Sequence, residues 1–217
     1  HQLGRYQAAL SSDGMTAAVA TYTTSGTGNY VKLYRRGTTG WEEFAEIPFS
    51  ADPVAALSGD SKVLTLYHPD NTNEGRGVIM TYDIDRENGT VVKRAFEMTG
   101  KAANERFGQE IRLNIDGSIL AVVAQKYVEV YEWDSASNVW ALKGTRFPNI
   151  GNTSNTDSRR IGTLHMNEEG TIVGFNHQGY RSPLGEDVGA PDYREGAHQL
   201  YTWNESEEKW EEKGGFV

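Results

Sequence analysis

The sequence contains no cysteine. This absence excludes disulfides, thiolate metal ligands and cysteine nucleophiles together. Proline is also scarce, at 6 of 217 residues, and no apolar run approaches the roughly 18 residues that a membrane-spanning helix needs. The formal net charge is −9, which leaves no basic stripe to neutralise phosphates. We therefore expect no nucleic acid partner and no membrane insertion.

The residues that are abundant favour a folded all-β domain. Hydrophobic residues make up 37% and aromatic residues 11% of the chain, whereas a disordered chain carries few aromatics. The 24 glycines suit a fold with many tight turns. At this length, residues 1–217 form one domain that can bury about 70% of the surface of its unfolded chain.

The central segment, residues 108–143, shows the pattern most clearly. Four runs rich in β-branched and aromatic residues are separated by the turn Asp116-Gly117, a break at Lys126 and the turn Ser135–Asn138. Such runs between Asp-Gly and Ser/Asn clusters are typical of antiparallel hairpins. The predicted strands are Gln109–Asn114, Ser118–Gln125, Tyr127–Asp134 and Val139–Lys143.

The same four-stranded unit recurs on both sides of this segment. One tyrosine marks each copy, with spacings of 48, 49 and 70 residues, so the fourth copy carries an insertion of about 20 residues. These tyrosines are Tyr34, Tyr82, Tyr131 and Tyr201. The copies span approximately residues 3–47, 52–98, 107–146 and 160–217.

Tryptophans accompany the tyrosines. Trp133 and Trp203 each follow a marker tyrosine by two positions, which places both rings on one face of a strand. Trp41, Trp140 and Trp210 each begin the last strand of a copy. Such a row could form a platform for sugar stacking, but we favour packing between neighbouring repeats as the reason for the recurrence.

A four-stranded unit of about 50 residues cannot bury both faces of its sheet alone. Packing several such units around a central axis buries these faces. In LNIDGSILAVV (residues 113–123), in KYVEVYEWD (residues 126–134) and in the following Trp140, the chain resembles the β-propeller superfamily. It looks closest to secreted blades of the integrin-like (FG-GAP) or kelch-like kind. The resemblance implies four four-stranded antiparallel blades, in a closed four-bladed ring or as part of a larger ring. We favour the closed ring.

The metal-binding patterns of such families are incomplete here. Kelch blades carry a glycine pair before the tyrosine, which is absent here. The calcium loop D-x-D-x-D-G keeps only its last half at Asn114-x-Asp116-Gly117 and at Ser11-x-Asp13-Gly14. We expect no cofactor, with calcium as the alternative. The run Asp83-x-Asp85-x-Glu87 fits a solvated turn better than a calcium loop. The insertion flanked by His177 and His198 holds Asp187, Asp192 and Glu195, but their spacing matches no standard zinc motif.

Two charged residues of the central copy require a separate interpretation. Glu110 and Arg112 alternate on the first predicted strand of that copy, so both would point into a central channel. They could bind a ligand there, but we favour a mutual ion pair.

Three N-x-S/T sequons predict N-glycosylation at Asn88, Asn152 and Asn204. The chain begins at His1 without an initiator methionine, which fits a mature secreted protein, a proteolytic piece or an excised domain. We therefore expect an extracellular location. An intracellular scaffold remains the alternative if all three sequons are unmodified in native material.

No G-x-S-x-G motif or other catalytic signature occurs in the sequence. We therefore expect a non-enzymatic extracellular binding, adhesion or structural-assembly module, whose partner is a protein or a glycan and which could form a homo-oligomer. The alternative is a carbohydrate-binding or carbohydrate-active propeller.

The longest predicted loop, residues 178–196, is the candidate contact surface. In a four-stranded meander the long connections lie at one end of the blades, and long loops on a rigid scaffold commonly carry recognition. The expected partner-binding residues are Tyr180, Arg181, Asp187, Asp192, Tyr193 and Arg194, joined by Arg159 and Arg160 from the neighbouring connection. The alternative is an insertion that is merely tolerated at the surface.

Overall fold

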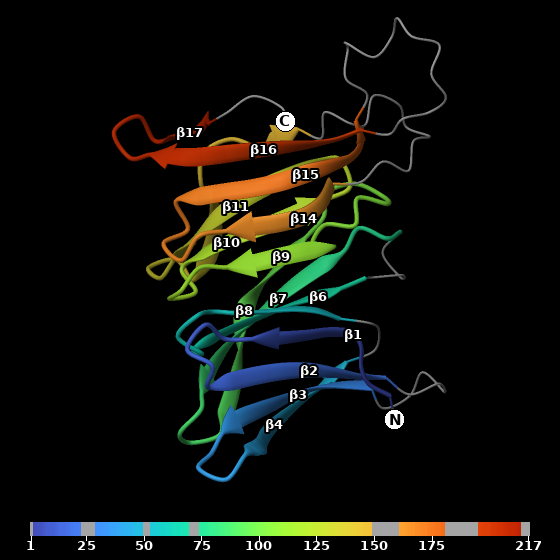
Figure 1. The fold of residues 1–217 in the computed structure, drawn as a ribbon, viewed down its shortest axis with the longest axis vertical. Helices are drawn as coiled ribbons and strands as arrows, with labels where there is room; N and C mark the ends of the chain where they lie inside the picture. Colours follow the sequence, from blue (N-terminus) through green and yellow to red (C-terminus); the bar gives the residue numbers. More distant parts are fainter. Residues whose placement is uncertain are drawn as a thin grey trace, which may run out of the picture.

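A computed structural model describes residues 2–22, 29–49, 53–69, 74–148, 161–180 and 195–213 of the chain. These residues form β-strands, turns and bends, and they include no helix long and apolar enough to cross a membrane. The strands form four antiparallel sheets, which we call blades 1 to 4 in chain order (Figure 1). The all-β prediction and the four-stranded repeat are confirmed.

Each blade is a meander of consecutive strands. Blade 1 contains β1 (Gln2–Leu10), β2 (Thr16–Tyr22), β3 (Asn29–Arg36) and β4 (Trp41–Phe49). Blade 2 contains β5 (Val54–Leu57), β6 (Val63–His68), β7 (Val78–Asp85) and β8 (Thr90–Thr99). Blade 3 contains β9 (Glu110–Leu113), β10 (Ile119–Ala124), β11 (Tyr127–Asp134), β12 (Val139–Leu142) and the short β13 (Phe147–Pro148), which pairs with β11. Blade 4 contains β14 (Ile161–Met166), β15 (Ile172–Tyr180), β16 (Glu195–Asn204) and β17 (Lys209–Glu212).

Two parts of the predicted connections are strands instead. The ladder between β15 and β16 continues to the pair Tyr180 and Glu195, so both ends of the predicted loop 178–196 belong to blade 4. In blade 3, Phe147 pairs with Val128 although the sequence places it in a connection. In both cases backbone hydrogen bonding across the sheet extends beyond the run with strong β-propensity.

In the first turn of each blade, a polar side chain accepts a hydrogen bond from a backbone N–H of the same turn. In blade 3, Asn114 Oδ1 accepts a hydrogen bond of 2.9 Å from the backbone N–H of Ile119, while Asp116 Oδ1 accepts one of 2.9 Å from the N–H of Ser118. Ser11, Ser58 and Asn167 hold the corresponding turns of the other blades. The half of the calcium motif that the sequence keeps therefore closes a hairpin, because Asn and Asp side chains satisfy turn N–H groups.

These turns also join neighbouring blades. The N–H of Asp13 donates to the carbonyl of Gly59 at 3.0 Å, the N–H of Asp60 donates to the carbonyl of Ile115 at 2.8 Å, and the N–H of Ile115 donates to the carbonyl of Glu168 at 2.8 Å. A chain of backbone hydrogen bonds therefore runs from blade 1 to blade 4 along one side of the molecule.

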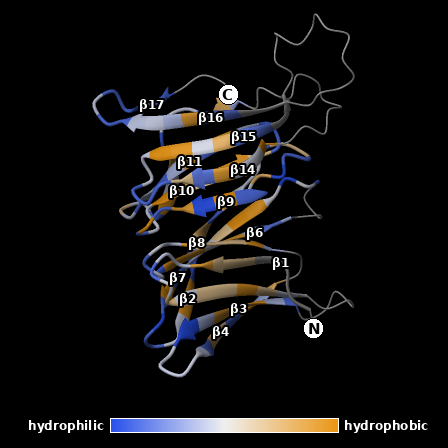
Figure 2. Ribbon diagram, in the orientation of Figure 1, coloured by the Kyte–Doolittle hydropathy of each residue, from blue (hydrophilic) through white to orange (hydrophobic). Residues whose placement is uncertain are grey.

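The hydrophobic core lies between the blades. One cluster of buried side chains fills each of the three junctions, and the strands carry most of the hydrophobic residues (Figure 2). Trp140 of blade 3 is buried there and donates its indole N–H to Thr81 Oγ1 of blade 2 at 3.0 Å. Trp210 of blade 4 donates to the carbonyl of Lys143 at 2.8 Å. Inter-blade packing thus accounts for these recurring rings, as we expected.

The described blades form an open row. Extensive contacts between first strands join β1 to β5, β5 to β9 and β9 to β14, and blades 1 and 4 lie at opposite ends of the long axis (Figure 1). The closed four-bladed ring that the sequence favours is therefore not seen in the described part of the chain. The other predicted arrangement, part of a larger ring, leaves the two end faces free for further blades.

Candidate binding pocket between blades 2 and 3

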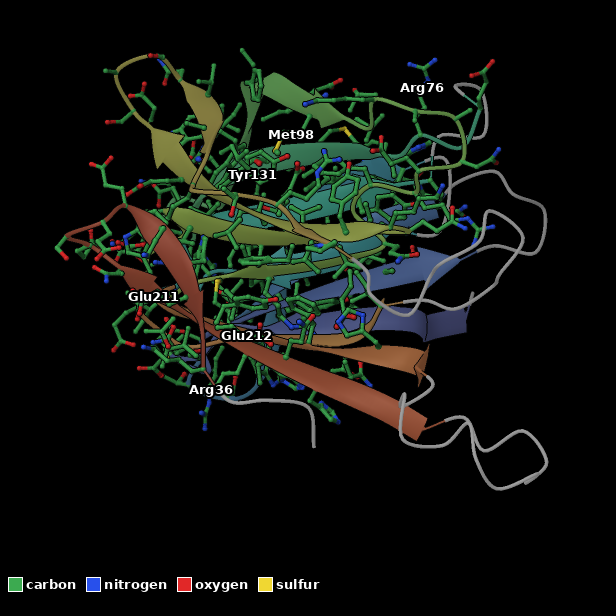
Figure 3. The ribbon with its side chains drawn as sticks, turned by 90° about the horizontal axis from the view of Figure 1, so that it is seen from above. Arg36, Arg76, Met98, Tyr131, Glu211 and Glu212 are labelled. Carbon is green, nitrogen blue, oxygen red and sulfur yellow. The ribbon has the colours of Figure 1, made fainter. Side chains whose placement is uncertain are left out.

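A pocket of about 300 Å³ lies between blade 2 and blade 3. Met98 of β8 and Tyr131 of β11 come from the two adjacent blades and lie close together (Figure 3). The lining is mainly apolar and aromatic, as small-molecule sites usually are. It consists of Phe96, Glu97, Met98, Thr99 and Lys101 from blade 2 and the residues after it, Phe107 from the connection, and Tyr127, Glu129, Tyr131, Trp140 and Leu142 from blade 3.

Strand alternation directs the side chains of blade 3 into this pocket. Tyr127, Glu129 and Tyr131 are two residues apart on β11, so they project from the same face of the sheet. The pairs Trp133–Trp140 and Tyr131–Leu142 place the side chains of β12 on that face as well. Trp140 is buried, whereas Leu142 is 48% exposed and lies where solvent reaches the pocket.

A buried carboxylate forms the polar part of the lining. Glu129 is 4% exposed. Its Oε1 accepts a hydrogen bond of 2.9 Å from Nε of Arg146 and lies 2.8 Å from Nη2 in an ion pair, and its Oε2 accepts a hydrogen bond of 2.5 Å from the hydroxyl of Tyr131. A buried carboxylate needs such compensation, because an unpaired charge in the interior costs several kcal/mol.

Tyr127 sits beside this group. Its hydroxyl donates a short hydrogen bond to Glu105, and the guanidinium of Arg146 lies 3.6 Å from the centre of its ring, in a cation–π arrangement. Burial raises the pKa of the Tyr127 phenol, and the hydrogen bond to Glu105 raises it further. Burial and the hydrogen bond to Glu129 raise the pKa of Tyr131 in the same way. Both phenols therefore remain protonated donors at neutral pH.

The two phenols are protonated and bonded to carboxylates, which removes them as bases or nucleophiles. The pocket instead combines aromatic surface with a fixed array of charged donors and acceptors, which suits a ligand with apolar faces and a few polar groups.

Sequence reasoning did not single out this group. The alternation Tyr127-x-Glu129-x-Tyr131 inside a buried strand is a usable signal, because a charge on the core face of a strand needs a partner. Glu105 and Arg146 carry no comparable signal. They lie in connections: Arg146 directly precedes β13, whose pairing with β11 brings it beside Glu129, and Glu105 lies between blades 2 and 3.

The predicted contact residues fall outside the described structure. Arg159, Arg160, Arg181, Asp187, Asp192, Tyr193 and Arg194 lie outside the described residues, as does the sequon residue Asn152. Tyr180 ends β15 and pairs with Glu195 through the backbone, and its side chain is not described. The contact surface on residues 178–196 therefore stays a prediction.

The candidate metal-binding residues have protein partners. The Oδ1 of Asp83 accepts from Arg94 Nη2 at 2.7 Å, and Asp85 accepts from the N–H of Asn88 at 3.0 Å. The fully buried His177 hydrogen-bonds Gln199 through its Nε2 at 2.6 Å, and burial lowers the pKa of this histidine. Within the described ranges, no group of three or more His, Asp and Glu side chains is close enough to hold a metal ion.

The charged pair of the first strand of blade 3 is the predicted ion pair. Arg112 Nη2 lies 2.8 Å from Glu110 Oε1, and the same carboxylate oxygen accepts a hydrogen bond of 3.1 Å from the backbone N–H of Leu164. Glu110 therefore links blade 3 to blade 4, which is a structural role.

Two of the sequon asparagines are described. Asn88 is exposed, and its side-chain amide donates to Asp85 Oδ2 at 2.7 Å. The amide of Asn204 donates to Glu211 Oε1 at 2.8 Å. A glycan would replace one of the two hydrogens on either amide nitrogen, and glycosylation stays a prediction.

No protein-family model matches the sequence, and no curated protein matches it. Solved structures do match. The β-propeller domain of the trilobed protease from Pyrococcus furiosus, which has an open velcro topology, matches 97% of this chain and 57% of its own length with a TM-score of 0.53 and 12% identity. The fold is a β-propeller fold. This propeller also resembles a functionally unknown protein from Desulfotomaculum acetoxidans (TM-score 0.57, 14% identity, 94% of this chain and 53% of the other).

A third match is a provisional 6-phosphogluconolactonase from Bacteroides fragilis, with a TM-score of 0.57, 12% identity, and coverage of 94% of this chain and 55% of the other. The propeller described here thus spans about half the length of the solved structures it matches. At these identities the likeness concerns the fold, and the site must be argued from its own residues.

Proposed function

We propose that this propeller is a non-enzymatic binding module and that the pocket between blades 2 and 3 is its binding site. The observation that supports the proposal most is the combination of aromatic walls with the fully bonded Glu129 at one junction. The ligand would be a long side chain of a bound peptide, or a small molecule with an apolar face. The carboxylate and the protonated phenols would fix its orientation.

We place the module outside the cell, where it would take part in adhesion or in a structural assembly. This part of the proposal rests on the three sequons in the sequence. The residues 178–196 and the paired Arg159 and Arg160 would add a second contact area for a protein partner.

A carbohydrate-binding or carbohydrate-active propeller is the second candidate. It is favoured by one observation: two carboxylates, Glu97 and Glu129, line the same aromatic pocket. Sugars stack on aromatic rings, and glycoside hydrolysis uses a pair of carboxyl groups. Arg146 holds Glu129 in place through an ion pair of 2.8 Å.

The test compares substitutions at two exposed apolar residues. Leu142→Arg places a charge at the pocket, while Val92→Arg makes the same change at a residue of blade 2 that is 62% exposed and does not line the pocket. Binding of the wild type to peptide and glycan arrays is measured first, and the dissociation constants of the hits are then determined by calorimetry.

We expect Leu142→Arg to weaken the hits at least tenfold, which corresponds to about 1.4 kcal/mol, and Val92→Arg to leave them unchanged. Equal affinities for both variants would show that the pocket is not the binding site. Release of sugar from a polysaccharide panel that Glu129→Gln abolishes would favour the second candidate over the first.

A further inference from the structure

The free end of blade 1 exposes a tryptophan that is buried in other blades. Trp140 pairs across the last hairpin of blade 3 with Trp133 and is 5% exposed, because blade 2 covers it. Trp210 has the corresponding position in blade 4 and is 8% exposed. Trp41 pairs with Arg36 in the same way in blade 1, and it is 48% exposed. The row contains no blade that precedes blade 1 among the described residues.

The glycines in the first turns of the blades also show that blade 1 is uncovered where blades 3 and 4 are covered. A Cβ atom added at Gly117 would lie 2.5 Å from Val63 of blade 2, and one at Gly170 would lie 2.7 Å from Ile119 of blade 3. Gly14 is the corresponding glycine of blade 1, and a Cβ there would meet no atom within 4 Å. The backbone of blade 1 thus has the shape for a covering blade, and no described residue fills the space beside Gly14.

The opposite end face, on blade 4, exposes aliphatic side chains. Ile172 of β15 has the position of Ile119 in blade 3, but it is 37% exposed where Ile119 is 5% exposed. Leu200 of β16 has the position of Val130, and their exposures are 45% and 0%. In blade 3 these positions pack against the next blade, so blade 4 presents the surface that a following blade would cover.

We propose that these two end faces bind each other in a head-to-tail dimer, with blade 1 of each copy packed on blade 4 of the other to close a ring. Trp41 and Gly14 on one face, and Ile172 and Leu200 on the other, have the positions that form the junctions already present in the row. A second copy therefore supplies both missing halves at once. Two copies of four blades would also provide the length that the matched propellers have, since this chain spans 53% and 55% of two of them.

The repeat specifies a hydrogen bond for the new junction. Trp210 donates to the carbonyl of Lys143, whose own N–H donates to the carbonyl of Val130. In blade 4 the N–H of Lys213 donates to the carbonyl of Leu200 at 2.8 Å in the same way. The indole N–H of Trp41 would therefore meet the carbonyl of Lys213 of the second copy.

Glu211 on the blade 4 face is the acidic partner available to Arg36 on the blade 1 face. Arg36 projects away from the sheet (Figure 3), and its side chain forms no ion pair within the described part of the chain. In blade 4 the residue at the position of Arg36 is Trp203, and Nζ of Lys143 from the preceding blade lies 4.4 Å from the centre of its ring. The cation there would be Lys213, which is already paired with Glu211 at 3.0 Å. Glu211 would then lie between Lys213 and Arg36 and bind both.

The first test is the mass of the chain in solution. Light scattering after size exclusion should give about 48 kDa for the wild type, twice the 24.1 kDa of one chain. Trp41→Lys should give a folded monomer with an unchanged circular dichroism spectrum, because Trp41 is half exposed in the single chain. The control Val92→Lys, at an apolar residue that is 62% exposed within the row, should remain dimeric. A wild type that is monomeric at every concentration would overturn the proposal.

The second test fixes the orientation of the copies. Because the chain has no cysteine, the double variant Trp41→Cys with Leu200→Cys introduces the only two thiols. These positions correspond to Trp140 and Thr81, whose side chains are in hydrogen-bond contact at 3.0 Å. Because cysteine is much shorter than tryptophan, a bifunctional thiol-reactive reagent is used in place of a direct disulfide. It should cross-link the double variant into covalent dimers and leave each single-cysteine variant uncross-linked. Cross-linking of Trp41→Cys alone would indicate that blade 1 meets blade 1, and it would refute the head-to-tail arrangement.

Discussion

The ion pair at the pocket between blades 2 and 3 provides the sharpest test of the energetic reasoning. The side chain of Glu129 is 5% exposed and that of Arg146 is 44% exposed, with 2.8 Å between them. Removing one partner of a buried pair costs about 3–5 kcal/mol, because the other charge is left uncompensated. Tyr131 would still donate to Glu129, and the guanidinium is partly solvated. We therefore expect Arg146→Met to destabilise the fold by about 2–4 kcal/mol at neutral pH.

The assay is urea unfolding at neutral pH with linear extrapolation to water. Arg35→Met is the matched control: its ion pair with Glu42 lies at 3.4 Å with side chains 37% and 53% exposed, so it should cost less than about 1 kcal/mol. If Arg146→Met and Arg35→Met were equally mild, the buried carboxylate would not depend on its arginine and the reasoning would be refuted.

Two further predictions concern the blade junctions and pH. Gly117→Ala should destabilise the fold by at least about 2 kcal/mol more than Gly14→Ala. Both glycines have a positive φ (+72° and +67°), but only at Gly117 does the new Cβ meet a neighbouring blade. Equal losses of stability in thermal or urea unfolding would contradict this. Burial lowers the pKa of His177, so the unfolded state binds more protons below the ordinary histidine value of about 6.5. The unfolding free energy should therefore fall as the pH decreases below about 6.5. The fall should be steeper in the wild type than in His177→Gln. Parallel pH profiles of the two proteins would contradict this role of His177.

Much of the fold follows from local sequence. Alternating β-branched and aromatic runs, with Asp-Gly and Asn-Gly turns between them, predict each of the four meanders, because strand pairing and turn geometry depend on residues close in the chain. The marker tyrosines locate the repeats for the same reason. The limits of β15, β16 and β13 were not predictable in this way, since a ladder continues wherever a partner strand lies alongside it.

The candidate site was less accessible to sequence reasoning. Glu129 could be noticed as a charge on the core face of a strand, but its partner Arg146 lies 17 residues away in a connection. The phenol of Tyr127 donates a hydrogen bond to Glu105, which is 22 residues away along the chain. Such contacts depend on how the connections fold back onto β11, and no local pattern encodes them.

The sequence by itself determined the class of the molecule: an acidic all-β chain without thiols, built from four copies of one four-stranded unit. Turn chemistry and strand periodicity act over a few residues, so one chain of letters is enough to reveal them. Only the tertiary structure decided that the four blades form an open row, that Trp140 is buried while Trp41 at the same repeat position is 48% exposed, and that a carboxylate, an arginine and two tyrosines meet at one junction. The physical reason is that burial is a property of neighbouring blades. Identical local patterns acquire different environments according to whether another blade covers them.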